Sequence, residues 1–510
     1  MLSLTILLMH SCAKDLGNYS YQNINELEIS NWQENYAALL DIDTLHINPI
    51  ITSTTGLNDT TNYEFRWVIK EGSFKQDTIG KTANLNFPVN IPTGNYLLQY
   101  RIRDKNSNLT FSKTANLNIA TPYTRGILIS GVDTEGNAEA AILSMVNDTI
   151  YIKDLLKNSG IDKTLIGPKH FFYGAGMYDV HKQMWFTSET GSYYFDRKTM
   201  KSTPNSTLQN FLLPTDPIDI TLEHLELMAP QIIDNNGQSG DEAYKAALSN
   251  NGNIYTTFTS ISFGMFYNPV NRVATNIDEL LPAAPYLMYP IGNMSSLMWY
   301  DTKNDRFMNI QGFLGVDHST YPIDQVGDVF SWNLQLEGKK LRYAENTFNK
   351  DGGFNNGNTL AVVEDSQGIS NIYKFHARGS NPVKLASYHV KPIALFFKQA
   401  DQYAFSSTRS VVFYTYQGRL FAYDYNPNNE RFYEFNMLLD KSISMIKFDT
   451  QQNPVQNSLY IATHDVTSGG SLQRFLLGNN PNTVQLIPIT NAIWHNLFKI
   501  KDVNWKAERY

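Results

Sequence analysis

The chain has 510 residues, of which 42% are hydrophobic and 17% are charged. It is therefore long enough to bury more than one core and too apolar to be intrinsically disordered. The formal net charge of −7, without any cluster of Lys and Arg, argues against a protein that binds nucleic acid. Aromatic residues reach 13% of the chain, and such residues favour half-buried β-strands over solvated helices. We therefore expect an all-β protein.

The chain begins with an apolar segment that ends near its single cysteine. Residues 2–9 are mostly apolar, and Cys12 follows them before the chain turns polar. So short a segment cannot span a membrane, which takes about 20 helical residues, but it has the length of the hydrophobic part of a secretory leader. A small residue followed by cysteine at this point resembles the bacterial lipobox. The sequence predicts a lipoprotein signal peptide at residues 1–11 and a lipidated tether at residues 12–30, with Cys12 as the lipid anchor; the alternative is an ordinary signal peptide.

The next part of the chain, residues 31–121, has the pattern of a small β-domain. Apolar and polar residues alternate in short segments such as residues 63–69 and 96–102, as they do in strands with one buried face. Turn residues, mainly Gly, Asn and Asp, separate the segments. Trp67 lies in the middle of one segment, where a large aromatic side chain can fill the space between two sheets. The pattern predicts a β-sandwich of the immunoglobulin type.

Four short motifs occur in this first part of the chain. They are Cys12-Ala13-Lys14-Asp15-Leu16-Gly17-Asn18-Tyr19-Ser20-Tyr21, Leu45-x-Ile47-x-Pro49, Tyr63-x-x-x-Trp67 and Gly94-Asn95-Tyr96. The motifs resemble those of the PKD-like family of Bacteroidota surface lipoproteins. The resemblance implies an immunoglobulin-like module, attached to the outer membrane at Cys12 and followed by a larger β-domain. It also implies a TonB-dependent transporter and its lipoprotein lid as partners, because members are usually encoded beside such a pair.

The remainder, residues 122–510, repeats one unit, which consists of a strand, a tight polar turn and a second strand that often ends in an aromatic-Asp pair. Residues 411–414, the turn Gln417-Gly418 and residues 419–424 form the clearest copy. The units recur about every 50 to 60 residues, which predicts a β-propeller of about seven blades. A stacked pair of further sandwiches is the alternative. Short helical turns are expected at residues 150–157, 218–228 and 241–247.

The chain contains no recognisable catalytic motif. Its 10 His residues are scattered, without a His-Glu-x-x-His pair, and neither a Gly-x-Ser-x-Gly elbow nor a Gly-rich phosphate loop occurs. Residues 424–430 alternate oxygen-bearing side chains, but the segment lacks the central Gly of a calcium loop, and we interpret it as a turn. The sequence therefore predicts a protein without catalytic residues, cofactor or metal.

Aromatic and Met side chains in loops are the candidates for ligand binding. Residues 282–292 contain too many Pro residues for a central strand, so we expect side chains with exposed faces there and in two other aromatic-rich segments. Tyr and Met give contact area at a low cost in conformational entropy, which suits peptides or sugars. Local packing of these loops on the propeller is the alternative. The predicted ligand-binding residues are Tyr173, Phe266, Tyr267, Tyr286, Met288 and Tyr289.

Together these features predict an outer-membrane lipoprotein at the cell surface. We expect it to bind an oligopeptide, a glycan or a partner protein as a non-enzymatic accessory of a TonB-dependent nutrient uptake system. The alternative is an extracellular propeller enzyme, a lyase or hydrolase that acts on a polymer. A cluster of His with Asp, Glu or Arg at the centre of the propeller would favour that alternative. A purely structural or adhesive role is a third hypothesis.

Overall fold

The computed structural model divides the chain into two compact units, Met1–Ala120 and Thr121–Tyr510. Cys12, the predicted signal peptide and most of the predicted tether lie outside the described residues. Within the described ranges, no helix is long and apolar enough to cross a membrane. The structure describes residues 24–56, 60–72, 75–146, 148–174, 176, 178, 181–229, 243–292, 294–313, 316–436 and 441–508.

The strands of the first unit form one five-stranded sheet and two strand pairs. The sheet has the order β2-β9-β8-β5-β6, and β1 pairs with β4 and β3 with β7. The bounds are β1 (Leu27–Ser30), β2 (Asn35–Leu39), β3 (Thr44–Ile47), β4 (Ile50–Ser53), η1 (Thr60–Asn62), β5 (Tyr63–Glu71), β6 (Lys75–Gly80), β7 (Leu85–Pro88), β8 (Gly94–Asp104) and β9 (Thr110–Ala120).

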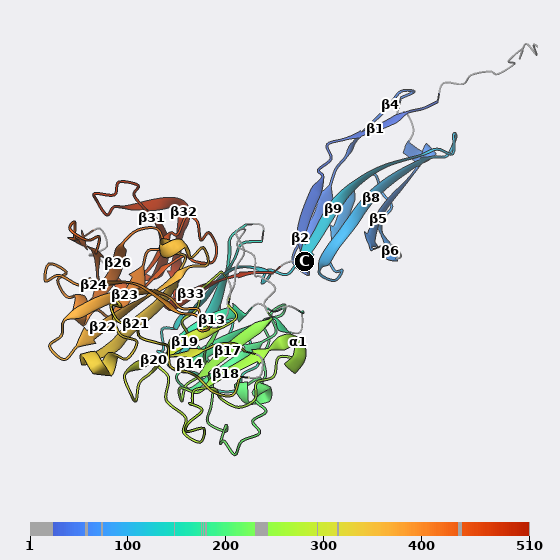
Figure 1. The fold of residues 1–510 in the computed structure, drawn as a ribbon. Helices are drawn as coiled ribbons and strands as arrows, with labels where there is room; N and C mark the ends of the chain where they lie inside the picture. Colours follow the sequence, from blue (N-terminus) through green and yellow to red (C-terminus); the bar gives the residue numbers. More distant parts are fainter. Residues whose placement is uncertain are drawn as a thin grey trace, which may run out of the picture. The chain divides into compact units, whose positions relative to one another are not determined.

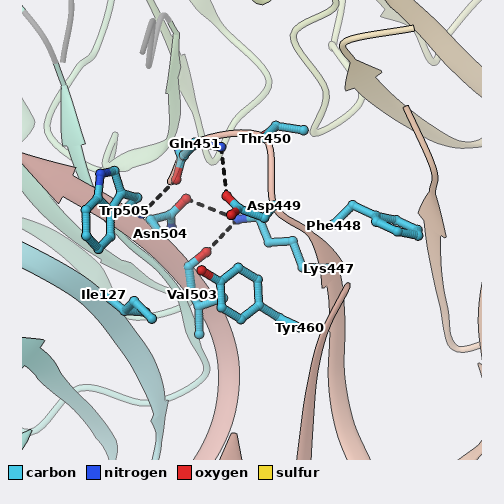
Figure 2. Close-up of a pocket in the computed structure, with 10 residues that line it drawn as sticks. All are labelled: Ile127, Lys447, Phe448, Asp449, Thr450, Gln451, Tyr460, Val503, Asn504 and Trp505. Carbon is cyan, nitrogen blue, oxygen red and sulfur yellow. Dashed lines mark hydrogen bonds between the residues drawn. The ribbon is translucent and has the colours of Figure 1, made fainter. Parts of the chain in front are cut away.

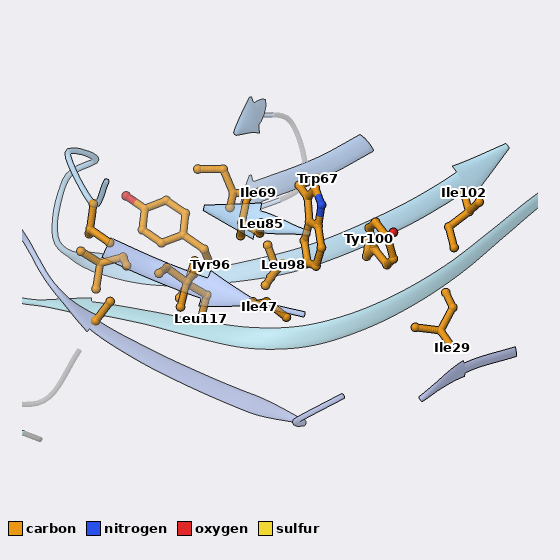
Figure 3. Close-up of a cluster of buried hydrophobic side chains, with 14 of the residues drawn as sticks. Ile29, Ile47, Trp67, Ile69, Leu85, Tyr96, Leu98, Tyr100, Ile102 and Leu117 are labelled. Carbon is orange, nitrogen blue, oxygen red and sulfur yellow. The ribbon is translucent and has the colours of Figure 1, made fainter. Parts of the chain in front are cut away.

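The core of the first unit lies between the large sheet and the two strand pairs. Alternate residues of β8 are buried, as the sequence pattern predicts, and they pack with Ile29 of β1 and Ile47 of β3 (Figure 3). Trp67 is fully buried, and its ring stacks on Tyr100 with 4.1 Å between the centroids. Its indole N–H donates to the carbonyl of Thr82 at 2.9 Å, which satisfies the polar atom of this core residue. The predicted role of Trp67 as a filler between sheets is confirmed.

The described strands of the second unit form seven sheets. Four sheets have four strands, with the orders β33-β10-β11-β12, β21-β22-β23-β24, β25-β26-β27-β28 and β29-β30-β31-β32. The other sheets are β13-β14-β15, β16-β17-β18 and β19-β20, and isolated bridges from Met288 and Thr320 extend the last of these on either side.

The elements of the second unit are mostly strands of three to twelve residues. The strand bounds are β10 (Arg125–Val132), β11 (Ala138–Ser144), β12 (Ile150–Ile152), β13 (Pro168–Gly174), β14 (Gln183–Ser188), β15 (Gly191–Phe195), β16 (Leu225–Ala229), β17 (Tyr244–Ser249), β18 (Ile254–Phe258), β19 (Leu297–Asp301), β20 (Arg306–Ile310), β21 (Lys339–Thr347), β22 (Asn358–Asp365), β23 (Ser370–His376), β24 (Val383–His389), β25 (Gln402–Phe405), β26 (Val411–Tyr416), β27 (Arg419–Asp424), β28 (Arg431–Phe435), β29 (Ser442–Phe448), β30 (Leu459–Asp465), β31 (Gly469–Leu477), β32 (Leu486–Leu497) and β33 (Lys499–Ala507). The helical turns are η3 (Leu208–Phe211), α1 (Thr259–Ser262), η4 (Leu334–Glu337), η5 (Asp351–Gly353) and η6 (Phe397–Gln399).

The seven sheets close into a ring, because buried apolar clusters lie between each sheet and the next. The last strand, β33, pairs antiparallel with β10, so that the end of the chain completes the first sheet (Figure 1). The cluster at this junction joins Ile127 of β10 and Trp505 of β33 to Met445 of β29. The predicted propeller of about seven blades is confirmed.

The aromatic-Asp pairs at the strand ends have a structural explanation. The ring packs in the core, as Tyr300 and Tyr423 do, and the carboxylate that follows it caps the turn. Asp301 accepts a hydrogen bond from the backbone N–H of Lys303 at 2.9 Å, and Asp424 accepts one from Asn426 at 3.1 Å. Among the residues that the structure describes, no group of three or more His, Cys, Asp or Glu could hold a metal ion.

The helical turns expected from the sequence are wrong at the residues that the structure describes as strands. The predicted segment 150–157 overlaps β12, the segment 218–228 overlaps β16, and the segment 241–247 overlaps β17. In β17, five consecutive residues from 245 to 249 are buried, because this strand lies in the middle of its sheet with covered faces. A continuous apolar run of this kind fits a buried strand as well as a helix, and the periodicity of the sequence does not separate the two.

The closing strand provides a test of the ring. Trp505 is 3% exposed and packs at the junction of the last and first sheets, so we expect Trp505→Ala to destabilise the propeller by about 3–5 kcal/mol through a cavity at this junction. Lys501, on the same strand, is exposed, and Lys501→Ala should change the free energy of unfolding by less than about 0.5 kcal/mol. Urea unfolding followed by tryptophan fluorescence and circular dichroism measures both. Equal effects of the two substitutions would contradict the importance of this junction.

Candidate functional site

Six strands lie next to one another around the centre of the ring. β33 contacts β13 and β29, β13 contacts β16, and β25 contacts β21 and β29. We call these six strands, β33, β13, β16, β21, β25 and β29, the inner strands. Each of them is the edge strand of its own sheet and pairs with a neighbouring strand on one side only. Side chains that point from these edges toward the centre of the ring therefore come from several blades.

Most inner strands carry a β-bulge near their first residues. The pairing register shifts by one residue there, which leaves an extra residue on the inner strand. Bulges turn side chains in new directions and are frequent beside binding sites. The extra residues are Lys501 of β33, Lys169 or His170 of β13, Glu226 of β16, Arg342 of β21 and Ser444 of β29.

The carboxylate of Asp502 connects three inner strands. Its Oδ2 lies 2.7 Å from Nδ1 of His170 on β13, and its Oδ1 accepts a hydrogen bond from Nζ of Lys447 on β29 at 2.8 Å. Asn504 donates to the same carboxylate at 2.7 Å and accepts from Lys447 at 3.0 Å. The side chain of Asp502 is 10% exposed, whereas those of His170 and Lys447 are 36% and 31% exposed. Solvent can therefore reach the side chains of His170 and Lys447.

A second ion pair adjoins the first through the neighbouring residue of β13. Nζ of Lys169 lies 2.6 Å from both carboxylate oxygens of Glu226 on β16. The side chain of Lys169 is 32% exposed, so this pair also reaches solvent. Five charged or titratable side chains from four inner strands thus lie together, and we call them the inner-strand cluster. Its members are Lys169, His170, Glu226, Lys447 and Asp502.

Glu345 on β21 adds a carboxyl group with different protonation behaviour. It accepts hydrogen bonds from the backbone N–H of Phe405 at 2.9 Å and from the hydroxyl of Tyr343 at 3.2 Å. Burial raises the pKa of Glu345 to about 7, although these bonds and the charge of Lys447 act in the opposite direction.

The carboxyl group of Asp502 behaves in the opposite way. Burial disfavours its charge, but Lys447 and His170 together hold the pKa of Asp502 well below its usual range. Near neutral pH, Asp502 is therefore ionised while Glu345 exchanges its proton. Carboxyl groups whose environments separate their pKa values in this way are typical of binding and catalytic sites.

A small cavity between β29 and β33 shows how Lys447 is held (Figure 2). The ammonium group of Lys447 also donates to the carbonyl of Val503 at 2.8 Å. Beside it, the amide oxygen of Gln451 accepts a hydrogen bond from the backbone N–H of Trp505 at 2.7 Å. The bonds to Asp502, Val503 and Asn504 fix the position of Lys447, and rigid positioning of charged groups favours selective binding.

Three of the predicted ligand-binding residues lie in the core. Met288 is 1% exposed, Phe266 is fully buried, and Tyr173 is 2% exposed. Met288 pairs with Met298 through the backbone and Tyr173 belongs to β13, so their side chains fill the spaces between sheets. The expectation that these three residues have exposed faces is wrong, and the alternative of local packing applies to them.

Of the other three predicted residues, Tyr286 and Tyr289 contact β21, and Tyr267 lies beside β18. The hydroxyl of Tyr286 donates to the carbonyl of Arg342 at 3.3 Å, and the ring is partly buried. Tyr289 is partly buried as well, and its backbone N–H donates to the side chain of Asn346 at 3.1 Å. Tyr267 is 48% exposed and lines a pocket of about 390 Å³. The ligand-binding role of these residues stays a prediction.

The sequence analysis missed the inner-strand cluster. Its members lie up to about 330 residues apart, as the contact between His170 and Asp502 illustrates. A signal was present, because charged residues interrupt otherwise apolar strands, as Lys447 does between Ile446 and Phe448. That signal marks single positions without indicating which of them meet.

Residues 12–160 match the model of the PKD-like family. The N-terminal part of the chain therefore contains a PKD-like domain, and the match continues past Ala120 into the first sheet of the second unit. This agrees with the resemblance seen in the sequence motifs. A search of curated proteins found no significant match.

Several solved structures are similar in overall arrangement. A quinonprotein alcohol dehydrogenase-like protein from Bacteroides thetaiotaomicron is 12% identical, with a TM-score of 0.37 over 94% of this chain and 99% of that one. The extracellular domain of a putative one component system from the same organism is 10% identical, with a TM-score of 0.36 over 93% and 71%. The WD40 domain of SCAP from fission yeast is 12% identical, with a TM-score of 0.28 over 53% and 54%. None of these similarities bears on function.

The raised pKa of Glu345 predicts a pH-dependent stability. A glutamate in an unfolded chain ionises near pH 4.3, whereas the folded protein keeps Glu345 protonated up to about pH 7. The contribution of protonated Glu345 to the stability of the folded protein is therefore complete below about pH 4 and is lost as the pH rises through 7. We expect Glu345→Gln to remove this contribution, which amounts to about 3 kcal/mol between pH 5 and pH 8. Urea unfolding of both proteins at the two pH values measures it, and identical pH dependence of the two proteins would contradict the assignment.

Proposed function

We propose that this protein captures a polar ligand at the inner-strand cluster, as a non-enzymatic, outer-membrane-anchored accessory of a nutrient uptake system. The observation that carries the proposal is the convergence of Lys169, His170, Glu226, Lys447 and Asp502 from four strands, with three of the side chains about one third exposed. Charged groups that are held rigidly and still reach solvent are arranged to form hydrogen bonds with a ligand.

The ligand class follows from the mixture of groups in the cluster. The ammonium group of Lys169 and the imidazole of His170 lie beside two carboxylates, so the cluster offers donors and acceptors within a short span. Oligopeptides and glycans both present such mixtures of groups. The PKD-like domain and the predicted lipid anchor at Cys12 support a place at the outer membrane beside a TonB-dependent transporter and its lipoprotein lid.

A single substitution tests the role of the cluster. Asp502→Asn keeps the shape of the side chain but removes the charge that positions His170 and Lys447. Short oligopeptides and oligosaccharides that raise the melting temperature of the natural protein should bind the variant about tenfold or more weakly, because charge-assisted hydrogen bonds are lost. Isothermal titration calorimetry measures the affinities. Asp278→Asn is the matched control, since Asp278 is exposed on another blade, and an equal loss in both variants would refute the proposal.

The partner is tested separately. The full chain with Cys12 intact, solubilised in detergent from its native membrane, should co-purify with a TonB-dependent transporter and its lipoprotein lid. Cys12→Ala should abolish membrane attachment and with it this association, while ligand binding in solution persists. Recovery of the acylated protein without such a pair would contradict the accessory role.

One observation favours an extracellular enzyme as the second candidate. Asp502 holds Nδ1 of His170, and no described residue bonds to Nε2, which is the arrangement that a general acid or base requires. An enzyme would convert the ligand, and His170→Asn would then lower the turnover rate far more than the affinity. Mass spectrometry of the ligand after incubation decides between the two, because a binding protein returns it unchanged.

A further inference from the structure

In the part of the chain that the structure describes, the third blade has one strand fewer than several other blades. Its described sheet has the order β16-β17-β18, whereas the sheet of β21 and three further sheets have four strands. Within the described residues, β18 (Ile254–Phe258) is therefore the last strand of its sheet. Where such an edge is left open, it presents backbone N–H and C=O groups to an extended chain that can reach it.

The backbone direction of β18 identifies which groups face outward. The carbonyl of Ile254 accepts a hydrogen bond from the N–H of Val270 at 2.8 Å, and the N–H of Ile254 donates to the side chain of Asn271 at 2.9 Å. The backbone N–H and C=O of Ile254 thus point away from β17. In an antiparallel pair, the backbone groups of every second residue do the same. The backbone groups of Thr256 and Phe258 therefore point outward too. The carbonyl of Phe258 accepts a hydrogen bond from the hydroxyl of Ser262 at 3.1 Å, whereas no described backbone group pairs with Thr256, which is the open position of the edge.

A pocket lies beside this open part of the edge. It has a volume of about 390 Å³, and its lining includes Thr256, Thr257, Phe258, Tyr267, Phe313 and Val316. The volume falls in the range of ligand-binding pockets. Most of these side chains are apolar, so the pocket suits an apolar side chain of a ligand whose main chain lies along β18.

Exposed apolar side chains line the pocket or follow its lining residues in the chain. Ile261 is 61% exposed and Tyr267 is 48% exposed. Phe263 is 85% exposed and has a φ of 53°, a left-handed conformation that is unfavourable for a bulky residue. Exposed aromatic side chains and local backbone strain occur together at sites that contact ligands.

The edge and the pocket together define a ligand. We propose that a free oligopeptide binds in extended form beside Thr256, the open position on the outer edge of β18, with one apolar side chain in the pocket. The outward N–H and C=O of Thr256 pair with its backbone, as in other cases of strand addition. A peptide fits better than a glycan because its donors and acceptors repeat at the spacing of a strand. The side chain of Asp317, which is 66% exposed and lines the pocket, favours a peptide with a basic residue nearby.

This site is independent of the proposed function at the inner-strand cluster. The pocket shares no residue with Lys169, His170, Glu226, Lys447 or Asp502. The carboxylate of Asp317 stays ionised, because its hydrogen bond with His318 holds the pKa of Asp317 below its usual range. A charge that persists at neutral pH gives the peptide site its own preference for cationic ligands.

The test compares two substitutions at one position. Thr256→Pro removes the outward N–H, and because that N–H does not pair with β17, the sheet should tolerate the proline. Thr256→Val keeps the N–H and the strand preference. The probe is a fluorescein-labelled hexapeptide, acetylated and amidated at its ends, in which Thr alternates with Val, Phe or Lys. Fluorescence polarisation should give about tenfold weaker binding for Thr256→Pro and an unchanged affinity for Thr256→Val.

Two further variants locate the peptide. Val316→Trp fills the pocket and should weaken binding as strongly as Thr256→Pro, whereas Val326→Ala, at an exposed apolar residue of another blade, should have no effect. Hydrogen exchange at the amides of Thr256 and Phe258 should slow when the peptide binds.

Absence of binding to the natural protein, or equal affinities of the two Thr256 variants, would overturn the proposal. Asp502→Asn should leave peptide binding here unchanged, so failure at one site is distinguishable from failure at the other.

Discussion

Pairing of β33 with β10 is the interaction on which both the ring and the inner-strand cluster depend. The pairing joins the end of the chain to the first sheet and closes the apolar junction between the last and first blades. It also brings Asp502 between His170 and Lys447, residues that belong to the second and last sheets. The cluster therefore exists only in the closed ring, and any event that releases β33 removes the shared carboxylate at the same time.

The charges at the centre are coupled through that carboxylate. Asp502 accepts bonds from an imidazole, an ammonium group and an amide, so its removal leaves several polar groups without their partner at once. Loss of one partner from a buried ionic network costs more than its individual contacts suggest. A ligand that bonds to His170 thus acts on a preorganised network, which lowers the entropy lost on binding.

The sequence predicted most of the fold because local patterns determine it. Alternation along β8, the central Trp67 and the aromatic-Asp pairs such as Tyr423-Asp424 are short-range features with one structural solution. The site was not predictable in the same way. A bulge that turns Glu226 toward Lys169 depends on pairing between strands, and apolar loop residues such as Met288 and Tyr267 look alike in sequence although one is buried and the other is exposed. Long-range contacts decide these outcomes.

The blades vary at two places that do not disturb their shared core. The clusters between sheets form from apolar side chains on several strands of each blade, as Met228, Ala247 and Tyr255 show for the third blade. A bulge at the start of an inner strand changes which side chain faces the centre of the ring. An open outer edge exposes backbone groups. Neither change alters the apolar packing between the sheets. A propeller with degenerate repeats can therefore carry a charged central cluster and an open peripheral edge at once, since neither feature shares its supporting contacts with the other.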